Sequence, residues 1–253
     1  MMEKPRVSIV MPAYNAAEVL ENTVRSVQAQ TFENWELIVV NDCSTDGTLT
    51  LLERLAGEDP RIRYFTNEVN SGAARSRNAG LDRCAGTFIA FLDSDDQWHP
   101  EKLQKQISRM EESGADIGYT SYAIVDGQGN KRCPDYVVPE RVTFEDMLKQ
   151  NQIGCSTVML RAKALGDNRF SVDFYHEDYV LWLQLMRSGC KAAGLTQVLT
   201  EYYFHEDSRA GNKGNAAKER WKIYRNFLRF SVVKSLWYFG HYALAGVLKY
   251  RQL

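Results

Sequence analysis

Short, mostly apolar runs alternate with helical patterns over the first hundred residues of the chain. The runs that are typical of buried strands lie at 7–11, 37–40, 62–65 and 88–92. Between them, helical patterns are predicted over 18–30, 48–55 and 72–81. Strands separated by helices indicate a mostly parallel sheet that is covered on both faces. Ligands of such sheets bind beyond the carboxyl ends of the strands, so we expect functional residues directly after each run.

The second half of the chain is less regular. Its pattern predicts helices over 101–113 and 177–188, and strands over 117–125, 137–138 and 157–160. The turn Gly127-Gln128-Gly129-Asn130 lies between the first two of these strands and indicates a hairpin-like connection. Because no low-complexity linker or internal repeat divides the chain, we expect one α/β domain over 1–212, with halves 1–100 and 101–212, and a C-terminal helical extension over 213–253.

The composition is that of an ordinary globular protein, with 44% hydrophobic and 25% charged residues and a net charge of -1. It excludes long disorder, a collagen-like chain and a disulfide scaffold. Five scattered cysteines without a C-x-x-C pair disfavour a zinc cluster and favour a reducing cytosol. The N-terminus has no apolar signal-peptide core, and the longest apolar stretch, 235–248, is too short to span a membrane.

The net charge conceals a basic C-terminal segment. Between Lys213 and Arg251, nine basic residues and one acidic residue give +8, which leaves -9 for the rest of the chain. On a helical wheel four of the basic residues form one stripe: Lys218, Lys222, Arg225 and Arg229. Tryptophan and tyrosine rings lie beside this stripe, so 213–253 fits an interfacial membrane segment. The alternative is that these helices pack on the core or on a partner subunit, as in a homodimer.

Three carboxylates follow the fourth strand within four residues, in Asp93-Ser94-Asp95-Asp96. Without a cation they would repel one another strongly. Mg²⁺ and Mn²⁺ prefer such oxygen ligands and usually share them with substrate phosphates. The position at the carboxyl end of a strand therefore favours a metal and phosphate site over a solvated acidic loop.

Two further polar segments follow the second and third strands. Asp42 ends the second strand and can accept a hydrogen bond from a base or a ribose, while Ser44 shapes the turn. The alternative for this turn is an N-cap for the next helix. The stretch 70–80 joins small residues to two arginines, whose planar donor forks suit carbonyls or phosphates. A well-packed helix with surface arginines would show the same pattern.

Together with Pro12-Ala13-Tyr14-Asn15 after the first strand, these segments resemble the family 2 glycosyltransferases. The four motifs have the order and spacing of that family from Val7 to Asp96. The resemblance implies the GT-A fold, an α/β architecture with a Rossmann-like mixed sheet flanked by helices. It also implies a nucleoside-diphosphate-sugar donor, most often a UDP-sugar, and Mn²⁺ or Mg²⁺ as cofactor. One departure is Cys43, where the family often has glycine.

The resemblance makes 1–100 the nucleotide-binding half. The residues that it implies for binding of the nucleotide-sugar are Pro12, Ala13, Tyr14, Asn15, Asp42, Ser44, Arg77, Asp93, Ser94 and Asp96. Asp42 and Arg77 would contact the uracil. Asp93 would contact the ribose or sugar, and Asp96 would face the donor sugar. Asp95 would ligate the metal that bridges the diphosphate.

The second half would bind the acceptor and supply the base. The resemblance makes Asp178 the catalytic base, with Glu177 orienting or binding the acceptor. A carboxylate at a helix N-terminus is stabilised as the anion; the alternative is that both residues only complement the helix dipole. The segment 202–209 resembles a C-terminal motif of the family, in which His205 is a candidate metal ligand and Ser208 and Arg209 are candidates to hold the leaving phosphate. Residues 212–215 would form a mobile lid.

The resemblance therefore predicts an inverting enzyme that moves a sugar from a UDP-sugar to a hydroxyl of a lipid-linked or oligosaccharide acceptor, the lipid being a polyprenyl diphosphate. The expected setting is bacterial surface-polysaccharide assembly, of O-antigen, capsule or a teichuronic-type polymer, at the cytoplasmic face of the membrane. No nucleic-acid partner is expected. A non-catalytic scaffold subunit and a sugar nucleotidyltransferase stay open as alternatives. A Rossmann dehydrogenase and a P-loop kinase are disfavoured, because their glycine-rich motifs are absent.

Overall fold

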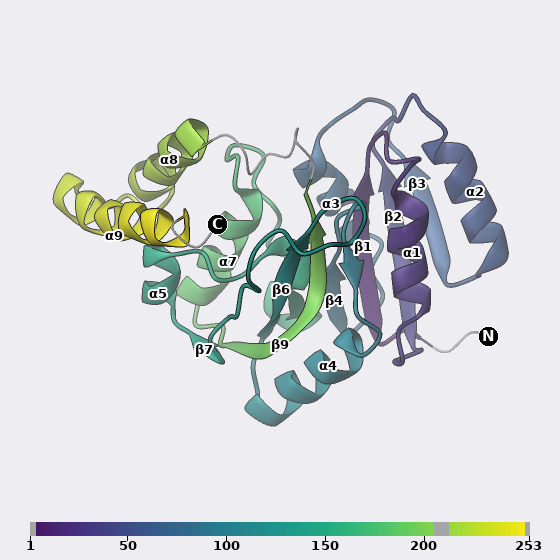
Figure 1. Cartoon of the computed structure of the whole chain (residues 1–253), viewed down its shortest axis with the longest axis horizontal. Helices are drawn as coiled ribbons and strands as arrows, with labels where there is room; N and C mark the ends of the chain where they lie inside the picture. Colours follow the sequence, from purple (N-terminus) through teal and green to yellow (C-terminus); the bar gives the residue numbers. More distant parts are fainter. Residues whose placement is uncertain (1–3, 205–212, 251–253) are drawn as a thin grey trace.

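One mixed nine-stranded sheet crosses the part of the chain that the computed structural model describes, residues 4–204 and 213–250 (Figure 1). Its strands are β1 (Val7–Ala13), β2 (Trp35–Asn41), β3 (Ile62–Thr66), β4 (Phe88–Phe91), β5 (Gln97–Trp98), β6 (Ile117–Val125), β7 (Arg141–Val142), β8 (Met159–Arg161) and β9 (Ala192–Tyr203). Neighbouring strands follow the order β3-β2-β1-β4-β8-β6-β9-β5, and β7 also pairs with β9.

The N-terminal part of the sheet is parallel, as the alternation of strands and helices predicts. β1 lies between β2 and β4, with Ile9 opposite Leu37 and Ala90. β3 extends the parallel set beyond β2. β8 then joins β4 antiparallel, β6 joins β8 antiparallel, and β9 runs parallel to β6. The carboxyl ends of β1, β2 and β4 therefore meet at one edge of the sheet.

Helices cover both faces of this sheet (Figure 1). Their bounds are α1 (Leu20–Gln28), α2 (Thr48–Glu58), α3 (Ala73–Leu81), α4 (Lys102–Ser113), α5 (Phe144–Lys149), α6 (Ala162–Leu165), α7 (Glu177–Arg187), α8 (Lys213–Lys222) and α9 (Val232–Tyr250). In β1, Ile9 and Met11 belong to the core cluster that α1, α2 and α4 complete, whereas Val10 belongs to the cluster of α3 and α7. Since successive strand residues point to opposite faces, both faces of β1 are buried.

Two parts of the second half differ from the expectation. Residues 137–138 lie in no strand, and the chain after β6 returns to it only through the isolated bridges Tyr122–Tyr136 and Val125–Lys131. The predicted hairpin-like connection is confirmed, but the prediction of a second strand over 137–138 is wrong. The long strand β9 was not predicted, because its burial does not alternate and its register with β6 shifts twice. β5 and β8 pair with strands of the other half, so one sheet contains strands from both 1–100 and 101–212. The two halves are thus not separate structural units, and their division into nucleotide-binding and acceptor-binding parts stays a prediction.

The C-terminal helices pack on the body of the protein near α5 and α7. Between α8 and α9, a π-helical turn (Ile223–Phe227) buries Tyr224, whose hydroxyl donates to the carbonyl oxygen of Leu148 at 2.6 Å. Arg220 is buried as well, and its guanidinium carbon lies 3.8 Å from the centroid of the Tyr179 ring. This segment is therefore anchored to the core by aromatic packing.

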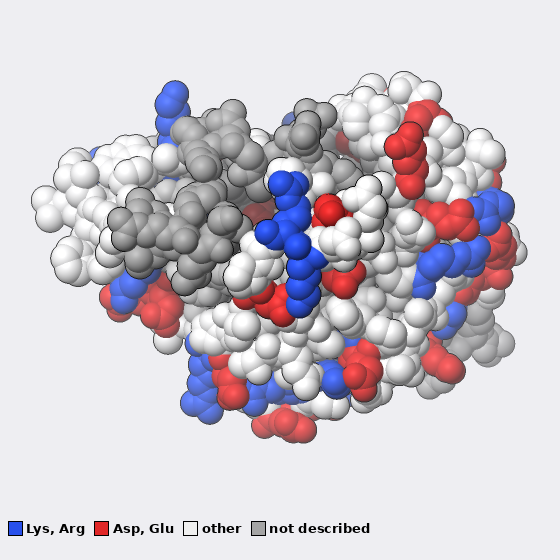
Figure 2. Space-filling model, viewed as in Figure 1, with Lys and Arg blue, Asp and Glu red and all other residues white. Residues whose placement is uncertain are grey.

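That anchoring changes the expected basic stripe. Lys222 donates to the carbonyl oxygen of Asp173 at 2.7 Å, and Arg225 donates to the carbonyl oxygen of Phe230. The stripe is thus not a uniformly solvated face. Figure 2 shows acidic and basic side chains interspersed over the body, while the described side chains at the end formed by α8 and α9 are mostly white, with isolated blue ones. No described helix is both long enough and apolar enough to cross a membrane.

Replacing Tyr224 tests the anchor. Tyr224→Ala should lower the free energy of unfolding by about 3–5 kcal/mol, because a fully buried aromatic ring is lost. Tyr224→Phe keeps the ring and should cost only about 1 kcal/mol for the hydrogen bond to Leu148. Urea denaturation of both variants measures the difference. Equal losses would show that ring packing does not hold the C-terminal helices to the core.

Candidate active site

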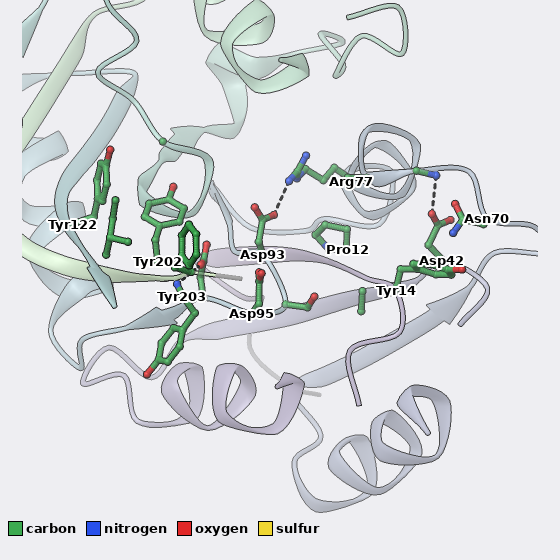
Figure 3. A pocket seen from close by; sticks show the side chains of 18 residues that line it. Pro12, Tyr14, Asp42, Asn70, Arg77, Asp93, Asp95, Tyr122, Tyr202 and Tyr203 are labelled. Carbon is green, nitrogen blue, oxygen red and sulfur yellow. Dashed lines mark hydrogen bonds and ion pairs between the residues drawn. The ribbon is translucent and has the colours of Figure 1, made fainter. Parts of the chain in front are cut away.

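A cavity of about 760 Å³ opens at the edge of the sheet where β1, β2 and β4 end. Figure 3 shows its three parts. The polar end is lined by Tyr14, Asp42 and Asn70, and the acidic centre by Arg77 and the segment 93–96. The aromatic end is lined by Tyr122, Tyr202, Tyr203 and Phe204, from β6, β9 and the residue after β9. The segments that the sequence singled out after the strands therefore share one cavity.

At the polar end, Asp42 is held by donors from the segment that leads into α3. Its carboxylate accepts hydrogen bonds from the backbone N–H groups of Ser71 at 2.9 Å and Gly72 at 2.7 Å, and from the side-chain amide of Asn67 at 2.7 Å. Burial alone would raise the pKa of Asp42, and these donors outweigh it and hold the pKa below its usual value. Asp42 is thus an ionised acceptor at neutral pH.

Asn15 and Ser44 join the loops after β1 and β2. The backbone N–H of Asn15 donates to the Ser44 hydroxyl at 3.0 Å, and the backbone N–H of Thr45 donates to the Asn15 side chain at 2.8 Å. Cys43, which directly precedes Ser44, has a φ of +60°, in the left-handed region that favours glycine. The departure from the family's glycine therefore falls on a residue with a strained backbone.

In the acidic centre, Arg77 from α3 joins two carboxylates. Its Nη2 lies 2.6 Å from Asp93 Oδ1, and its Nη1 lies 2.7 Å from Glu177 Oε1 at the start of α7. Burial alone would lower the pKa of Arg77, and the two carboxylates outweigh it and raise the pKa well above its usual value. The structure thus places Arg77 on carboxylates beside the cavity, while its expected contact with uracil stays a prediction.

The other acidic residues of the centre differ in exposure. Asp95 is half-buried and lines the cavity, as does Ser94. Asp96 is buried, and its carboxylate accepts hydrogen bonds from the Ser156 hydroxyl and from the backbone N–H of Tyr203. Burial, and then the charges of Asp95 and Asp93, raise the pKa of Asp96 well above its usual value. Asp96 is anchored to the protein in this structure, and a role at the donor sugar stays a prediction.

Asp178 follows Glu177 in the first turn of α7 and is half-buried. Burial, and then the charge of Glu177, raise the pKa of Asp178 to about 6, although Arg77 opposes this. One carboxylate oxygen accepts the backbone N–H of Tyr179 at 2.7 Å. A carboxylate whose pKa lies near neutrality is suited to accept a proton as a general base.

Residues 8–164 match the family model described as glycosyl transferase family 2. The chain belongs to this family. It is 39% identical to a protein named for teichuronic acid biosynthesis, the glycosyltransferase TuaG of Bacillus subtilis, over 97% of this chain and 98% of that one. It is 36% identical to an Escherichia coli enzyme named UDP-Glc:alpha-D-GlcNAc-diphosphoundecaprenol beta-1,3-glucosyltransferase WfgD, over 98% of this chain and 96% of that one.

Solved structures confirm the expected GT-A fold. TarS of S. aureus, in complex with UDP-GlcNAc, gives a TM-score of 0.76 at 21% identity, over 94% of this chain and 71% of that one. A mannosyltransferase from Pyrobaculum calidifontis, in complex with GDP-Man and Mn²⁺, gives 0.71 at 16% identity, over 96% of this chain and 74% of that one. At these identities the likeness concerns the fold. The protein is thus a glycosyltransferase with a mixed α/β sheet flanked by helices.

Some site residues of this glycosyltransferase escaped the sequence analysis, and others are not described. Tyr122, Gly154 and Ser156 approach or line the cavity from segments in which no spacing rule pointed to them. The small-residue run before β8 was the only signal near Ser156. The expected contacts of His205, Ser208 and Arg209, and the start of the expected lid, lie outside the described residues.

The raised pKa of Asp178 predicts that its ionised form destabilises the folded glycosyltransferase. The pKa of Asp178 is about 6 in the folded protein and 3.8 for an ordinary aspartate carboxyl, so the cost is absent below about pH 4 and fully present above about pH 6. Asp178→Asn should therefore raise the free energy of unfolding at pH 8 by on the order of 1–3 kcal/mol, and much less at pH 4. Urea denaturation at both pH values measures this. An effect that does not depend on pH would contradict the raised pKa.

Proposed function

We propose that this glycosyltransferase transfers a sugar, with inversion, from a UDP-sugar to a hydroxyl of a polyprenyl-diphosphate-linked saccharide during assembly of a bacterial surface polysaccharide. The observation that carries the proposal is the cavity that an ionised Asp42, the acidic segment 93–96 and Arg77 line, with Arg77 also paired to Glu177 of α7. The relatives named for teichuronic acid biosynthesis and for glucosyl transfer to an undecaprenol-linked sugar support the acceptor class. No observation favours a scaffold subunit or a nucleotidyltransferase.

The polar end of the cavity suits the nucleoside. Pro12, Ala13 and Tyr14 line it from the end of β1, and half of the Tyr14 side chain is exposed. Asp42 offers an ionised acceptor for an N–H of the base or a ribose hydroxyl. The TarS complex with UDP-GlcNAc supports a uridine nucleotide in this fold.

The acidic centre suits a divalent cation that is shared with the diphosphate. Among the described residues, no group of three or more His, Cys, Asp or Glu side chains is arranged to hold a metal ion. Asp95 nevertheless presents a hard oxygen ligand to the cavity, and Mg²⁺ or Mn²⁺ commonly combines one or two carboxylates with substrate phosphates. His205 is a further candidate ligand. Such an ion, when bound, neutralises charge on the leaving diphosphate.

Asp178 supplies the base in this proposal. It accepts the proton of the acceptor hydroxyl as that oxygen forms its bond to the anomeric carbon and the bond from that carbon to the diphosphate breaks. Glu177 is paired with Arg77, a lining residue of the cavity, so this contact ties the start of α7, and Asp178 next to it, to the cavity wall, although neither carboxylate of α7 is itself a lining residue. The relative named as a beta-1,3-glucosyltransferase supports inversion, because UDP-glucose carries its sugar in the alpha linkage.

Asp178→Asn should separate chemistry from binding. We expect transfer from UDP-sugars to a lipid-linked saccharide to fall by about 10²–10⁴-fold, while UDP affinity changes little, because a general base contributes to the transition state. Activity of the unchanged enzyme should fall as the pH drops below about 6, as Asp178 takes up a proton. Product formation from a panel of UDP-sugars measures transfer, and calorimetry measures UDP affinity. The control is Asp167→Asn, which changes an exposed carboxylate elsewhere. Unchanged transfer by the Asp178→Asn variant would show that Asp178 is not the catalytic base.

The exposed side of α9 supports peripheral attachment of the protein to the cytoplasmic face of the membrane. Val233, Leu236, Trp237 and Leu244 are 79%, 56%, 64% and 59% exposed and recur at helical spacing. Exposed Lys234 lies beside them. Apolar and aromatic side chains with adjacent cations are typical of helices that lie in a membrane interface. The alternative occupant of this face is a second copy of the chain.

Vesicle binding tests this face. The double variant Leu236→Glu and Trp237→Glu should reduce binding to phosphatidylglycerol vesicles at least tenfold in a sedimentation assay, because it puts two charges on the apolar side of α9. Val137→Glu is the matched control, since Val137 is 62% exposed on another part of the surface. Failure of the unchanged protein to bind vesicles, together with a dimer that the double variant dissociates, would assign the face to a second copy.

A further inference from the structure

Ser156 lies directly behind the acidic centre. It occupies the middle of a 3₁₀ turn (Cys155–Thr157) that leads into β8, the strand beside β4. Its side chain is fully buried. The segment 93–96 follows β4, and the turn with Ser156 comes just before β8. Because β4 and β8 are antiparallel neighbours, Ser156 lies next to that segment.

One hydroxyl ties both ends of the acidic segment. The backbone N–H of Asp93 donates to Ser156 Oγ at 3.1 Å, and Ser156 Oγ donates to a carboxylate oxygen of Asp96. The direction of the first hydrogen bond is fixed, because a backbone amide can only donate, and the Ser156 hydroxyl keeps its single proton for the contact with the Asp96 carboxylate when that group is ionised. Asp95, the candidate metal ligand, lies between the two tied residues.

The backbone of Ser156 is held just as firmly. Its N–H donates to the Tyr202 hydroxyl at 3.1 Å, and its carbonyl oxygen accepts the indole N–H of Trp98 at 2.7 Å. Next to it, the carbonyl oxygen of Thr157 accepts the side-chain amide of buried Gln106 at 2.9 Å. The turn therefore connects the acidic segment to β5 and β9 through Ser156 and to α4 through Thr157.

We propose that Ser156 is a positioning residue that fixes the 93–96 segment in the shape that binds a divalent cation and the donor diphosphate. This inference rests on the proposed function. Three carboxylates within four residues repel one another, and a segment that was free to respond would spread them apart. A buried hydroxyl that holds both ends keeps the Asp95 carboxylate directed into the cavity before any cation arrives. Partners that orient metal ligands in this way typically contribute about 10–100-fold to metal affinity.

The test compares two hydroxyl deletions in the same turn. Ser156→Ala removes the contacts to Asp93 and Asp96. The control Thr157→Val removes a neighbouring buried hydroxyl, whose hydrogen bond goes to the carbonyl oxygen of Gly154 at 2.7 Å and does not reach the acidic segment. Calorimetry measures UDP binding over a Mn²⁺ titration, and amide hydrogen exchange of Asp93 is measured in the metal-free protein.

Ser156→Ala should raise the Mn²⁺ concentration for half-maximal UDP binding by about 10–100-fold, with unchanged UDP affinity in the absence of metal. It should also speed exchange of the Asp93 amide at least tenfold, whereas Thr157→Val should leave both quantities as they are. If Ser156→Ala does not fold, Ser156→Cys, with a weaker donor of similar size, should shift both readouts in the same direction.

Wild-type values for Mn²⁺ and for Asp93 exchange in the Ser156 variant would overturn the inference. Equal shifts in Thr157→Val would also overturn it, since they would reflect general loosening of the turn. Absence of any Mn²⁺ effect on UDP binding by the unchanged protein would instead refute the metal in the proposed function. In that case, exchange of the Asp93 amide by itself would show whether Ser156 fixes the 93–96 segment.

Discussion

The buried guanidinium of Arg77 joins the elements that make the active site. It holds Asp93 after β4 and Glu177 at the start of α7, two segments that approach from different parts of the chain. Removing one partner of such a buried pair leaves an uncompensated charge and typically costs about 3–5 kcal/mol. The position of Asp178, next to Glu177, consequently depends on a contact that it does not itself make. In the proposed function, Arg77 would thus link recognition of the donor mechanically to deprotonation of the acceptor.

Among the described residues of this centre, the carboxylates outnumber the cations. Arg77 balances one of its two partners, Asp95 lines the same cavity, and Asp178 lies near enough for the charges of Glu177 and Arg77 to shift its pKa. An anionic diphosphate would be repelled here unless a divalent ion accompanied it. Burial, and then the charge of Glu177, raise the pKa of Asp178 to about 6. In the proposed function, the need for a divalent ion and the basicity of Asp178 would therefore share the negative charge of this centre as a cause.

The sequence predicted what depends on local pattern. The parallel strands, the residues after them and the helix that carries Asp178 follow from periodicity and from where parallel strands end. Partners distant in sequence do not follow from it. Helical spacing placed Arg77 on α3, but nothing in it pairs Arg77 with Glu177, and no pattern marks Ser156 as the contact of Asp93 and Asp96. The strand β9 escaped for a related reason, because its irregular register with β6 is set by tertiary packing.

The C-terminal charge also takes on a different meaning in three dimensions. Counted along the chain, the basic residues of the tail suggested an electrostatic contact with a membrane surface. In the fold, buried Arg220 stacks on the Tyr179 ring, and partly exposed Lys222 donates to the carbonyl oxygen of Asp173. Lys218 and Arg229 of the basic stripe stay exposed, as does the apolar side of α9, on which the proposed membrane contact relies. Burial of apolar area persists where salt screens exposed charges, so this side of α9, more than the basic stripe, would determine attachment.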